Sequence, residues 1–448
     1  MSMDKPIRRK FKPSLIGFSR RDFLKASAAV MGATVAAPAV HAQSGVTLRI
    51  LNTETSAASQ AALAKACAEY ESKFGIKVVV DSAPISDAMQ KGMAAINSGN
   101  PYDISVQGYI ATILEYIQAD AIIPLTDMVK KYEWGNNVAW QYKGENWYYP
   151  FDYNLVMNYY RKDLYAEKGL KIPETWDQFL ENCRALTVSK GGNIDVGGCV
   201  IPLASDSATN WASFGNLFAE GPQFIDSEWN VVLDQGENAD RTARFLDLYA
   251  ELYKTMPPGM NTVSYAQLMS LFATGKVAHS LYSGRLVEAL ESTNPELADK
   301  YGIFPSPGSS GTKALPFAFD GFVVFKSKQS EEAVKFLQWF VDEHYIDWLH
   351  SAWMNCQPAR MDVYEDKRWK SHPMIQKHWE TMMQMKSYVE GDKVKIMSID
   401  TIGPSIDILP CKVFNANVMP EMLQNKVLNN MSSAECVSLA AERIRALS

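Results

Sequence analysis

The sequence has 448 residues with a formal net charge of −6 at pH 7, and 47% of the residues are hydrophobic. A chain of this length can bury a large core and is typical of two domains. Its acidic balance opposes binding to phosphate backbones, so we do not expect nucleic acid as a partner.

The first 42 residues have the pattern of an export signal. A basic start is followed by Arg20-Arg21-Asp22-Phe23-Leu24-Lys25, a small and mildly apolar run over 26–40, and Val40-His41-Ala42. This order predicts a signal peptide cleaved near Ala42. The paired arginines are typical of twin-arginine (Tat) export, which carries folded proteins. A membrane anchor is the alternative, but the run is short and weakly apolar for a bilayer. We therefore expect a periplasmic protein exported by the Tat machinery.

Removal of the signal makes the protein more acidic. Residues 1–42 hold eight Lys/Arg and two Asp/Glu, so residues 43–448 carry a formal charge of −12. Six cysteines remain: Cys67, Cys183, Cys199, Cys356, Cys411 and Cys436. No spacing among them forms a metal or redox motif. Cys183 with Cys199 is the first pair to test for a disulfide, and buried free thiols are the expected state for most of the six.

Strand and helix patterns alternate at the start of the mature chain. Branched apolar residues predict strands over 46–51, 76–80 and 103–106. Helical spacing predicts helices over 59–74, closed by Gly75, and over 89–96. Strands that alternate with helices indicate βαβ units and a parallel sheet with right-handed crossovers.

The alternation continues through the second half. The apolar patterns predict strands over 154–160, 277–282 and 321–325. Helices are predicted over 175–186, 240–253, 265–274 and 330–350. Thr175 and Ser330 are the predicted caps of the first and last of these helices.

An ordered series of motifs resembles the family 1 extracellular solute-binding proteins, the group of maltose- and multiple-sugar-binding proteins. The segments that carry the resemblance are 101–104, 147–152 with 155–164, 172–179, 272–278 with Gly284, 326–328 with 331–336, and 357–360. The closest of these is Pro173-Glu174-Thr175-Trp176-Asp177, which is similar to the family's P-x-TWDE helix start. The likeness spans essentially the whole mature chain. Two departures concern the ligand: His279 stands where the family usually has Met, and Arg285-Leu286 replaces a tryptophan.

The resemblance implies an α/β fold of two Rossmann-like lobes with a hinge of crossing segments, the type II periplasmic binding protein fold. It places the crossings near 152–153, 319–320 and 358–361. Lobe one is then expected over 43–152 plus 320–357, and lobe two over 153–319 plus 358–448. A member of this family captures a small molecule, here a carbohydrate or polyol, and presents it to the transmembrane permease of an ABC importer. We expect it to be a monomer.

Ligands of open parallel sheets bind beyond the carboxyl ends of the strands. Aromatic rings match the flat faces of a sugar, and charged side chains match its hydroxyl rim. On this basis the candidate ligand-binding residues are Glu54, Tyr109, Asp152, Trp211, Tyr282, Arg285, Asp320, Trp353 and Arg360.

Each candidate also has a structural explanation. Arg285 could pair with Glu288 along a helix. Asp152 and Asp320 could bond hinge backbone. Glu54 could cap the first helix.

Two other functions are alternatives to capture of a sugar. An exported carbohydrate-active enzyme could use paired carboxylates such as Glu54 and Asp152, but no nucleophile elbow, phosphate loop or His pair at metal-ligand spacing is present. We therefore expect a non-catalytic protein without cofactor or metal. A polyamine or other small polar solute is the rival ligand, since aromatics over unpaired carboxylates would hold a cation.

Overall fold

The computed structural model of the chain describes residues 45–448 apart from residues 310 and 392. The predicted signal peptide over 1–42 lies outside these residues. The described residues form one unit with a large hydrophobic core.

The first sheet contains the strands predicted near the start of the mature chain. Its order is β2-β1-β3-β14-β4, with β5 paired to β14. β1 pairs in parallel with β2 and β3, which confirms the predicted βαβ units, whereas β14 is antiparallel to β3. The strands are β1 (Thr47–Asn52), β2 (Lys77–Ser82), β3 (Ile104–Gln107), β4 (Ile122–Ile123), β5 (Tyr149–Pro150) and β14 (Gly321–Phe325).

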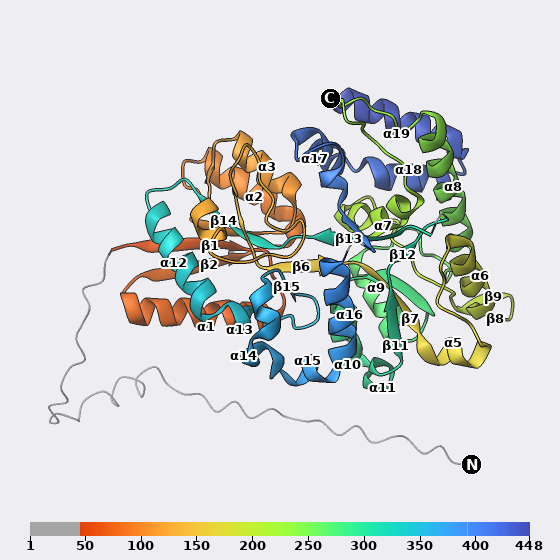
Figure 1. Cartoon of the computed structure of the whole chain (residues 1–448), viewed down its shortest axis with the longest axis horizontal. Coiled ribbons are helices and arrows are strands. Elements are labelled where there is room, and N and C mark those ends of the chain that lie inside the picture. The colour runs from red at the N-terminus through yellow and green to blue at the C-terminus, as the bar shows by residue number, and fades with distance from the viewer. Residues whose placement is uncertain (1–44, 310, 392) are drawn as a thin grey trace, which may run out of the picture. The chain divides into compact units, whose positions relative to one another are not determined.

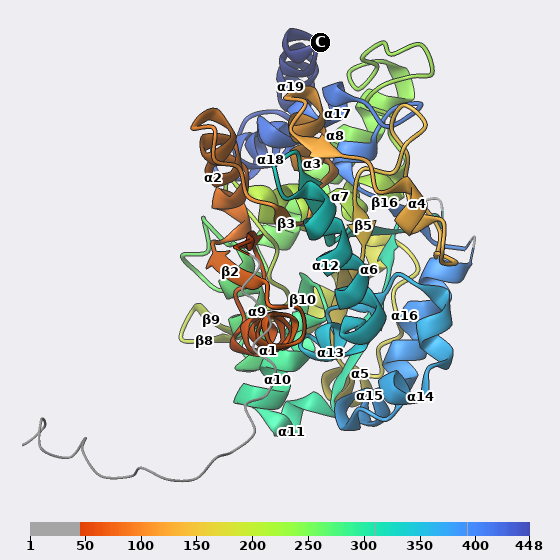
Figure 2. The ribbon, with the colours of Figure 1, turned by 90° about the vertical axis from the view of Figure 1, so that its left-hand side faces the viewer.

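Helices cover both faces of this sheet. α2 and α3 lie on one face, and α1, α12 and α13 lie on the other (Figures 1 and 2). Tyr70 of α1 contacts Phe336 and Trp339 of α12 with ring centroids 4.9 and 5.0 Å apart. The helices are α1 (Ala57–Phe74), α2 (Ile85–Asn97), α3 (Ile110–Gln118), α4 (Thr126–Val129), α12 (Ser330–Glu343) and α13 (Tyr345–His350).

Two short sheets and a hairpin make up the remaining β structure. One sheet has the order β10-β7-β11, and the other has the order β12-β13-β6-β15 with β16 paired to β13. The strands are β6 (Asp152–Leu155), β7 (Met157–Arg161), β8 (Val188–Lys190), β9 (Asn193–Val196), β10 (His279–Tyr282), β11 (Tyr301–Phe304), β12 (Ser306–Pro307), β13 (Lys313–Ala318), β15 (Gln357–Pro358) and β16 (Lys395–Met397).

Most helices of the second half surround these sheets (Figure 1). They are α5 (Lys162–Lys168), α6 (Trp176–Leu186), α7 (Ser207–Glu220), α8 (Gly236–Tyr253), α9 (Tyr265–Ala273), α10 (Arg285–Thr293), α11 (Pro295–Ala298), α14 (Lys367–Lys370), α15 (Pro373–Lys377), α16 (Trp379–Glu390), α17 (Ile408–Asn415), α18 (Val418–Val427) and α19 (Ser433–Leu447), with 3₁₀ turns at η1 (Met361–Glu365) and η2 (Ile399–Thr401).

Local signals in the sequence explain where several helices begin and end. Thr175 accepts a hydrogen bond from Gln178 N, which confirms the predicted cap of α6. Gly75 ends α1 at φ 72°, a left-handed conformation that glycine adopts without steric cost.

Two predicted elements are each divided in the structure. The helix predicted over 330–350 is α12 and α13, which are separated at His344 (φ −116°, ψ 0°), and the His344 ring packs on Trp339. Ser330 is the first residue of α12 rather than its cap. The strand predicted over 154–160 is β6 and β7, which belong to different sheets and separate at Val156.

The three segments predicted to cross between lobes lie side by side. β6 pairs antiparallel with β13, where Phe317 faces Leu155. It also pairs antiparallel with β15, where Pro358 faces Asp152. β13 continues through residues 319–320 into β14 of the first sheet, so these strands connect the two groups of elements in Figure 1.

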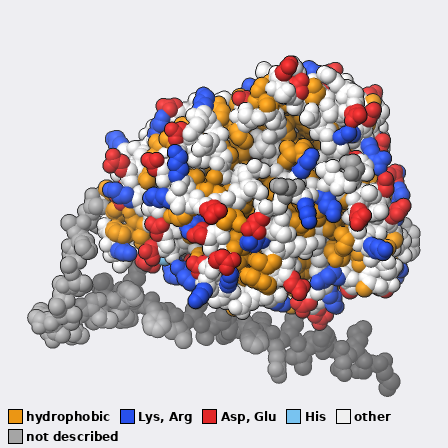
Figure 3. Space-filling model, in the orientation of Figure 1, with side chains coloured by type: hydrophobic (Ala, Val, Ile, Leu, Met, Phe, Trp, Pro, Cys, Tyr) orange, Lys and Arg blue, Asp and Glu red, His pale blue; other side chains and the backbone are white. Residues whose placement is uncertain are grey.

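The surface carries mixed charge. Lys/Arg and Asp/Glu side chains are interspersed over the face seen in Figure 3. No helix among residues 45–309, 311–391 and 393–448 is both long and apolar enough to cross a membrane.

Candidate functional site

Two candidate residues, Glu54 and Tyr109, follow strands of the first sheet. Glu54 follows β1, where the Asn52 side chain accepts from Glu54 N (3.1 Å) and donates to Glu54 O (2.8 Å). Tyr109 follows β3 and is the residue before α3. Ser56, and not Glu54, caps α1 by accepting from Ser59 N at 3.1 Å. The Glu54 carboxylate is therefore available for contacts beyond the sheet.

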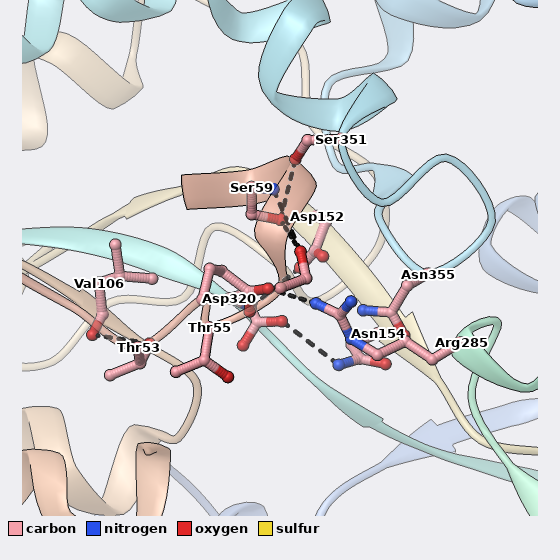
Figure 4. A network of polar contacts seen from close by, with 12 residues as sticks. Thr53, Thr55, Ser59, Val106, Asp152, Asn154, Arg285, Asp320, Ser351 and Asn355 are labelled. Carbon is pink, nitrogen blue, oxygen red and sulfur yellow. Dashed lines mark hydrogen bonds and ion pairs between the residues drawn. The ribbon is translucent and has the colours of Figure 1, made fainter. Parts of the chain in front are cut away.

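Asp152 and Asp320 form a buried carboxyl pair where the crossing strands meet the first sheet (Figure 4). Asp320 N donates to Asp152 Oδ1 at 3.1 Å, so Asp152 does bond hinge backbone. The side chain of Asn154 donates to Asp320 Oδ2 at 3.3 Å. Asp152 Oδ2 accepts no N–H or O–H hydrogen bond from the described residues, and the Cys356 thiol contacts the Asp152 carboxyl group and opposes the rise in its pKa.

Burial changes the protonation of this pair. Desolvation raises the pKa of Asp152 well above its ordinary value, and the charge of Asp320 raises it further. Burial raises the pKa of Asp320 to about 7, with Glu54 acting in the same direction and Arg285 opposing it. Burial and the repulsion between the two charges therefore favour retention of a proton by the pair.

Arg285 brings the cationic group to the site from the second half of the chain. It begins α10 directly after β10 and forms an ion pair with Glu54. Its second contact is Glu288 Oε2 at 3.8 Å, so the pairing along the helix exists beside the longer-range one. Burial opposes the charge of Arg285, but Glu54 and Glu288 outweigh it and raise the pKa.

The segment just before the third crossing is bound to the start of α10. Glu288 Oε1 accepts from Met354 N (3.1 Å) and Asn355 N (3.3 Å), and Ser283 Oγ donates to Asn355 Oδ1 (2.6 Å). A Cβ at Gly284 would lie 2.1 Å from Met354 O, so only glycine permits this approach. These contacts hold the start of α10, and Arg285 with it, against residues 354–355.

Four aromatic side chains lie beside these charged residues and complete the candidate site. Trp211 of α7, Tyr265 of α9 and Tyr282 of β10 have ring centroids about 6 Å apart, at 6.2, 6.0 and 5.8 Å for the three pairs. The Tyr109 hydroxyl lies 2.8 Å from the Tyr265 hydroxyl. Burial raises the pKa of all three tyrosines. The hydroxyls therefore stay protonated and act as hydrogen-bond donors and acceptors.

A polar contact fixes the helices that carry two of these rings. Asp206 caps α7 by accepting from Thr209 N at 3.2 Å, and it accepts from Ser264 Oγ, just before α9, at 2.5 Å. Ser207 Oγ lies 3.2 Å from the Tyr265 hydroxyl. The start of α7 and the start of α9 thus hold Trp211 and Tyr265 in one place.

The structure adds three residues that the sequence analysis did not name, Asn154, Tyr265 and Asn355, and it keeps Glu288 as the expected partner of Arg285. Tyr265 had one local signal, since it begins a helix directly after a polar capping residue, Ser264. The buried polar atoms Asn154 Oδ1, Trp211 Nε1 and Asn355 Nδ2 have no hydrogen-bond partner among the described residues. The group therefore presents both acceptors and donors.

Trp353 and Arg360 have their contacts elsewhere. The Trp353 ring stacks on His378 with centroids 5.3 Å apart. The Arg360 guanidinium lies over the rings of Tyr132 (3.9 Å) and Tyr345 (5.0 Å), and its Nε donates to Asp362 at 3.0 Å. Seven of the nine predicted site residues converge, and these two support neighbouring segments instead.

The chemistry of the group suits reversible binding. Glu54, Asp152, Glu288 and Asp320 are carboxyl groups beside one guanidinium, with four aromatic rings next to them. Among the residues that the structure describes, no three His, Cys, Asp or Glu side chains are grouped as metal ligands would be.

The family model of the bacterial extracellular solute-binding proteins matches residues 53–344 of this chain. The chain belongs to this family. The matched region contains all seven converging site residues, from Glu54 to Asp320.

One curated relative is similar to this chain over part of its length. The mannitol-binding protein of Pseudomonas aeruginosa is 26% identical over 212 residues, which cover 45% of this chain and 47% of that protein. The chain thus spans about half the length of this curated relative.

Maltose-bound T. maritima MalE3 is 18% identical with a TM-score of 0.72, covering 90% of this chain and 100% of that one. A solute-binding protein from Agrobacterium radiobacter in complex with ribitol is 19% identical with a TM-score of 0.70, covering 91% and 100%. These likenesses confirm the predicted type II periplasmic binding protein fold.

Proposed function

We propose that this solute-binding protein captures a polyol or sugar in the periplasm and delivers it, chemically unchanged, to the permease of an ABC importer. The observation that carries the proposal is the convergence of Glu54, Asp152, Arg285 and Asp320 from two sheets and the strands between them. The ligands named for the relatives, mannitol, maltose and ribitol, are all polyhydroxylated.

Hydroxyl groups match the unpaired polar atoms of the site. Asp152 Oδ2 and Asn154 Oδ1 supply carboxyl and amide oxygens, while Trp211 Nε1 and Asn355 Nδ2 supply N–H donors. A hydroxyl both donates and accepts, so a row of hydroxyls can satisfy both kinds of atom. The rings of Trp211 and Tyr282 offer apolar faces for the C–H groups of the same ligand.

Closure of two lobes is the proposed means of capture. We assign residues 43–152 plus 320–357 to lobe one and 153–319 plus 358–448 to lobe two. The Arg285–Glu54 pair and the Tyr109–Tyr265 contact then join the lobes. A ligand that contacts both lobes stabilises the closed state by its higher affinity for that state, and the permease recognises this closed shape.

The N-terminal pattern supports export. We propose that residues 1–42 direct the folded protein to the Tat machinery and are cleaved near Ala42. The periplasmic protein would then act as a monomer beside its permease.

A cationic solute such as a polyamine is the second candidate ligand. Four carboxyl groups face one guanidinium in the site, and aromatic rings next to carboxylates attract cations. A proton retained by the Asp152–Asp320 pair weakens this case, because a protonated pair offers less negative charge.

Thermal unfolding of residues 43–448 with a panel of pentitols, hexitols, monosaccharides, disaccharides, polyamines and amino acids tests the proposal. A ligand at about 100 times its Kd should stabilise the protein by roughly 2.7 kcal/mol. Asp320→Asn should abolish most of this shift, and exposed Asp240→Asn should retain it.

A polyol or sugar that stabilises the protein, and that is recovered unchanged by mass spectrometry, supports both ligand class and lack of catalysis. Stabilisation by polyamines alone would replace the ligand class. Recovery of a cleaved or oxidised ligand would contradict the binding role.

A further inference from the structure

Asp400 contacts the start of α3 from a distant part of the chain. Its Oδ2 accepts a hydrogen bond from Ala111 N at 3.2 Å, across 289 positions of the sequence. Tyr109, the residue before α3, supplies no side-chain cap of its own. A carboxylate that accepts from the first N–H groups of a helix caps it and interacts favourably with the helix dipole. Asp400 therefore fills a capping role that the local sequence leaves open.

The Asp400 carboxyl group is enclosed by its contacts. Asp400 is only 2% exposed. Burial raises its pKa, while hydrogen bonds from Ser398 and from the N–H groups of Ala111 and Ile110 oppose the rise. A buried carboxyl group that lost these partners would be left unsatisfied, which is costly. The contact with α3 is therefore favoured from the side of Asp400 as well.

The segment that carries Asp400 is held in place by its own neighbours. Asp400 lies in η2, shortly after β16, and β16 pairs with β13 where Pro316 faces Met397. Ser398 N donates to Thr401 Oγ1 at 3.2 Å and closes the turn of η2. The capping group thus has a defined position from which to hold α3.

The capped end of α3 carries a candidate ligand-binding residue. The hydroxyl of Tyr109 lies 2.8 Å from the Tyr265 hydroxyl, and its ring packs on Phe414 of α17 with centroids 4.8 Å apart. Asn210, directly before Trp211, donates to Phe414 O at 2.9 Å. α17 in turn packs against α3 (Figure 1). A shift of the start of α3 would therefore move Tyr109 relative to Trp211 and Tyr265.

Packing alone does not fix this end of α3. A cavity of about 550 Å³ borders it, and Ile110, Phe319 and Thr401 are among the residues that line the cavity. A helix end beside a cavity lacks part of the contacts that a filled core supplies. The hydrogen bond from Ala111 to Asp400 adds a restraint on the side where packing is incomplete.

We propose that Asp400 is a positioning residue of the ligand site, which caps α3 and thereby holds Tyr109 beside Trp211 and Tyr265. This inference rests on the proposed function, in which Tyr109 contributes to ligand binding. Asp400 acts through Tyr109 and needs no contact with the ligand. Loss of the cap frees the start of α3 and weakens binding by displacing Tyr109.

Hydrogen–deuterium exchange of the ligand-free protein measures the cap directly. Asp400→Ala should speed exchange of the Ala111 amide by about tenfold or more. Asp400→Asn should keep exchange close to that of the wild type, because asparagine also caps helices. Asp366→Ala is the matched control, since Asp366 caps α14 by accepting from Arg368 N at 2.6 Å and α14 carries no candidate site residue. It should leave Ala111 unchanged.

Calorimetric titration with mannitol, ribitol and maltose measures the effect on the site, and the polyol or sugar selected by the thermal panel is used if none of the three binds. Asp400→Ala should weaken binding by about 3–30-fold, whereas Asp400→Asn and Asp366→Ala should stay within about twofold of the wild type.

A double-mutant cycle with Tyr109→Phe separates positioning from a general loss of stability. Tyr109→Phe should weaken binding by about tenfold in the wild type and by about threefold or less in Asp400→Ala, where Tyr109 is no longer held. A variant that is merely destabilised would leave the two effects additive. If Asp400→Ala does not fold, Asp400→Leu replaces it, because leucine fills the space without accepting a hydrogen bond.

Three results would overturn the inference and leave the proposed function intact: unchanged exchange of Ala111 in Asp400→Ala, additive losses in the cycle, or an equal loss of affinity in Asp366→Ala. No binding of any polyol or sugar of the panel by the wild type would instead overturn the proposed function, and this inference with it.

Discussion

Arg285 and Glu54 form an ion pair across 231 positions of the chain. Arg285 follows β10 and Glu54 follows β1, so the pair connects two sheets beside the buried Asp152 and Asp320. The pair therefore links the segment after β1 to the start of α10.

Removal of either partner of this ion pair should weaken ligand binding. Glu54→Gln and Arg285→Gln should each cost about 1–3 kcal/mol of binding free energy, since each leaves a half-buried charge unpaired. The double variant should lose less than the sum of the two. Calorimetry with the best ligand of the panel measures the coupling, and strictly additive losses would show that the pair does not act as a unit.

Asp320 should make the ligand-free protein less stable as the pH rises. Its pKa is raised from 3.8 to about 7, so the folded state holds a proton that the unfolded state has released. The stability from this proton is present below about pH 4 and is lost as the pH rises through 7. The free energy of unfolding can be measured with urea at pH 5 and at pH 8. Its difference between the two pH values should be about 1–3 kcal/mol smaller for Asp320→Asn than for the wild type. An unchanged difference would contradict the raised pKa.

His279 should act in the opposite direction. Its ring lies 2.6 Å from Gly198 O through Nδ1 and 2.7 Å from the Tyr165 hydroxyl through Nε2. Burial lowers the pKa of His279 from 6.5 to about 4, so the unfolded state takes up a proton first and stability falls as the pH drops from 6.5 to 4.

His279→Met removes this titration while filling similar space. The loss of unfolding free energy between pH 7 and pH 5 should be about 1–2 kcal/mol smaller in the variant. Parallel curves for the variant and the wild type would show that His279 is not the titrating group.

The six cysteines should be inaccessible thiols in the folded protein. All six are free and buried, and burial raises the pKa of Cys67 to about 12. A thiol reagent should modify none of them in native conditions and all six after unfolding without reductant. Four reactive thiols after unfolding would indicate a disulfide, and Cys183 with Cys199 would be the first pair to map.

Trp211 and Trp353 should differ in their effect on binding. Trp211→Phe removes an unpaired buried N–H and part of a ring in the aromatic group, which should weaken binding by about 3–30-fold. Trp353→Phe is the matched substitution and should retain affinity, because Trp353 stacks on His378. Equal losses in the two variants would return Trp353 to the ligand site.

Local chemistry in the sequence was enough to predict the α/β class and several of the longer elements. Branched apolar runs marked β1, β2 and β3, Thr175 marked the start of α6, and Gly75 marked the end of α1. These signals are reliable because capping and left-handed turns depend on a few neighbouring atoms. Strand ends, predicted crossings and one polar loop also indicated seven residues that the structure brings together, and their role in binding stays a prediction.

Only the tertiary structure decided which of these residues meet. Glu54 pairs with Arg285, and the Tyr109 hydroxyl bonds the Tyr265 hydroxyl. Asn154 and Asn355 enter the site through strand pairing and backbone contacts between distant segments. The structure also placed Trp353 and Arg360 with other partners. No periodic pattern in the sequence indicates such contacts, because they depend on how the crossing strands place one sheet against another. That placement is set by packing of the whole core.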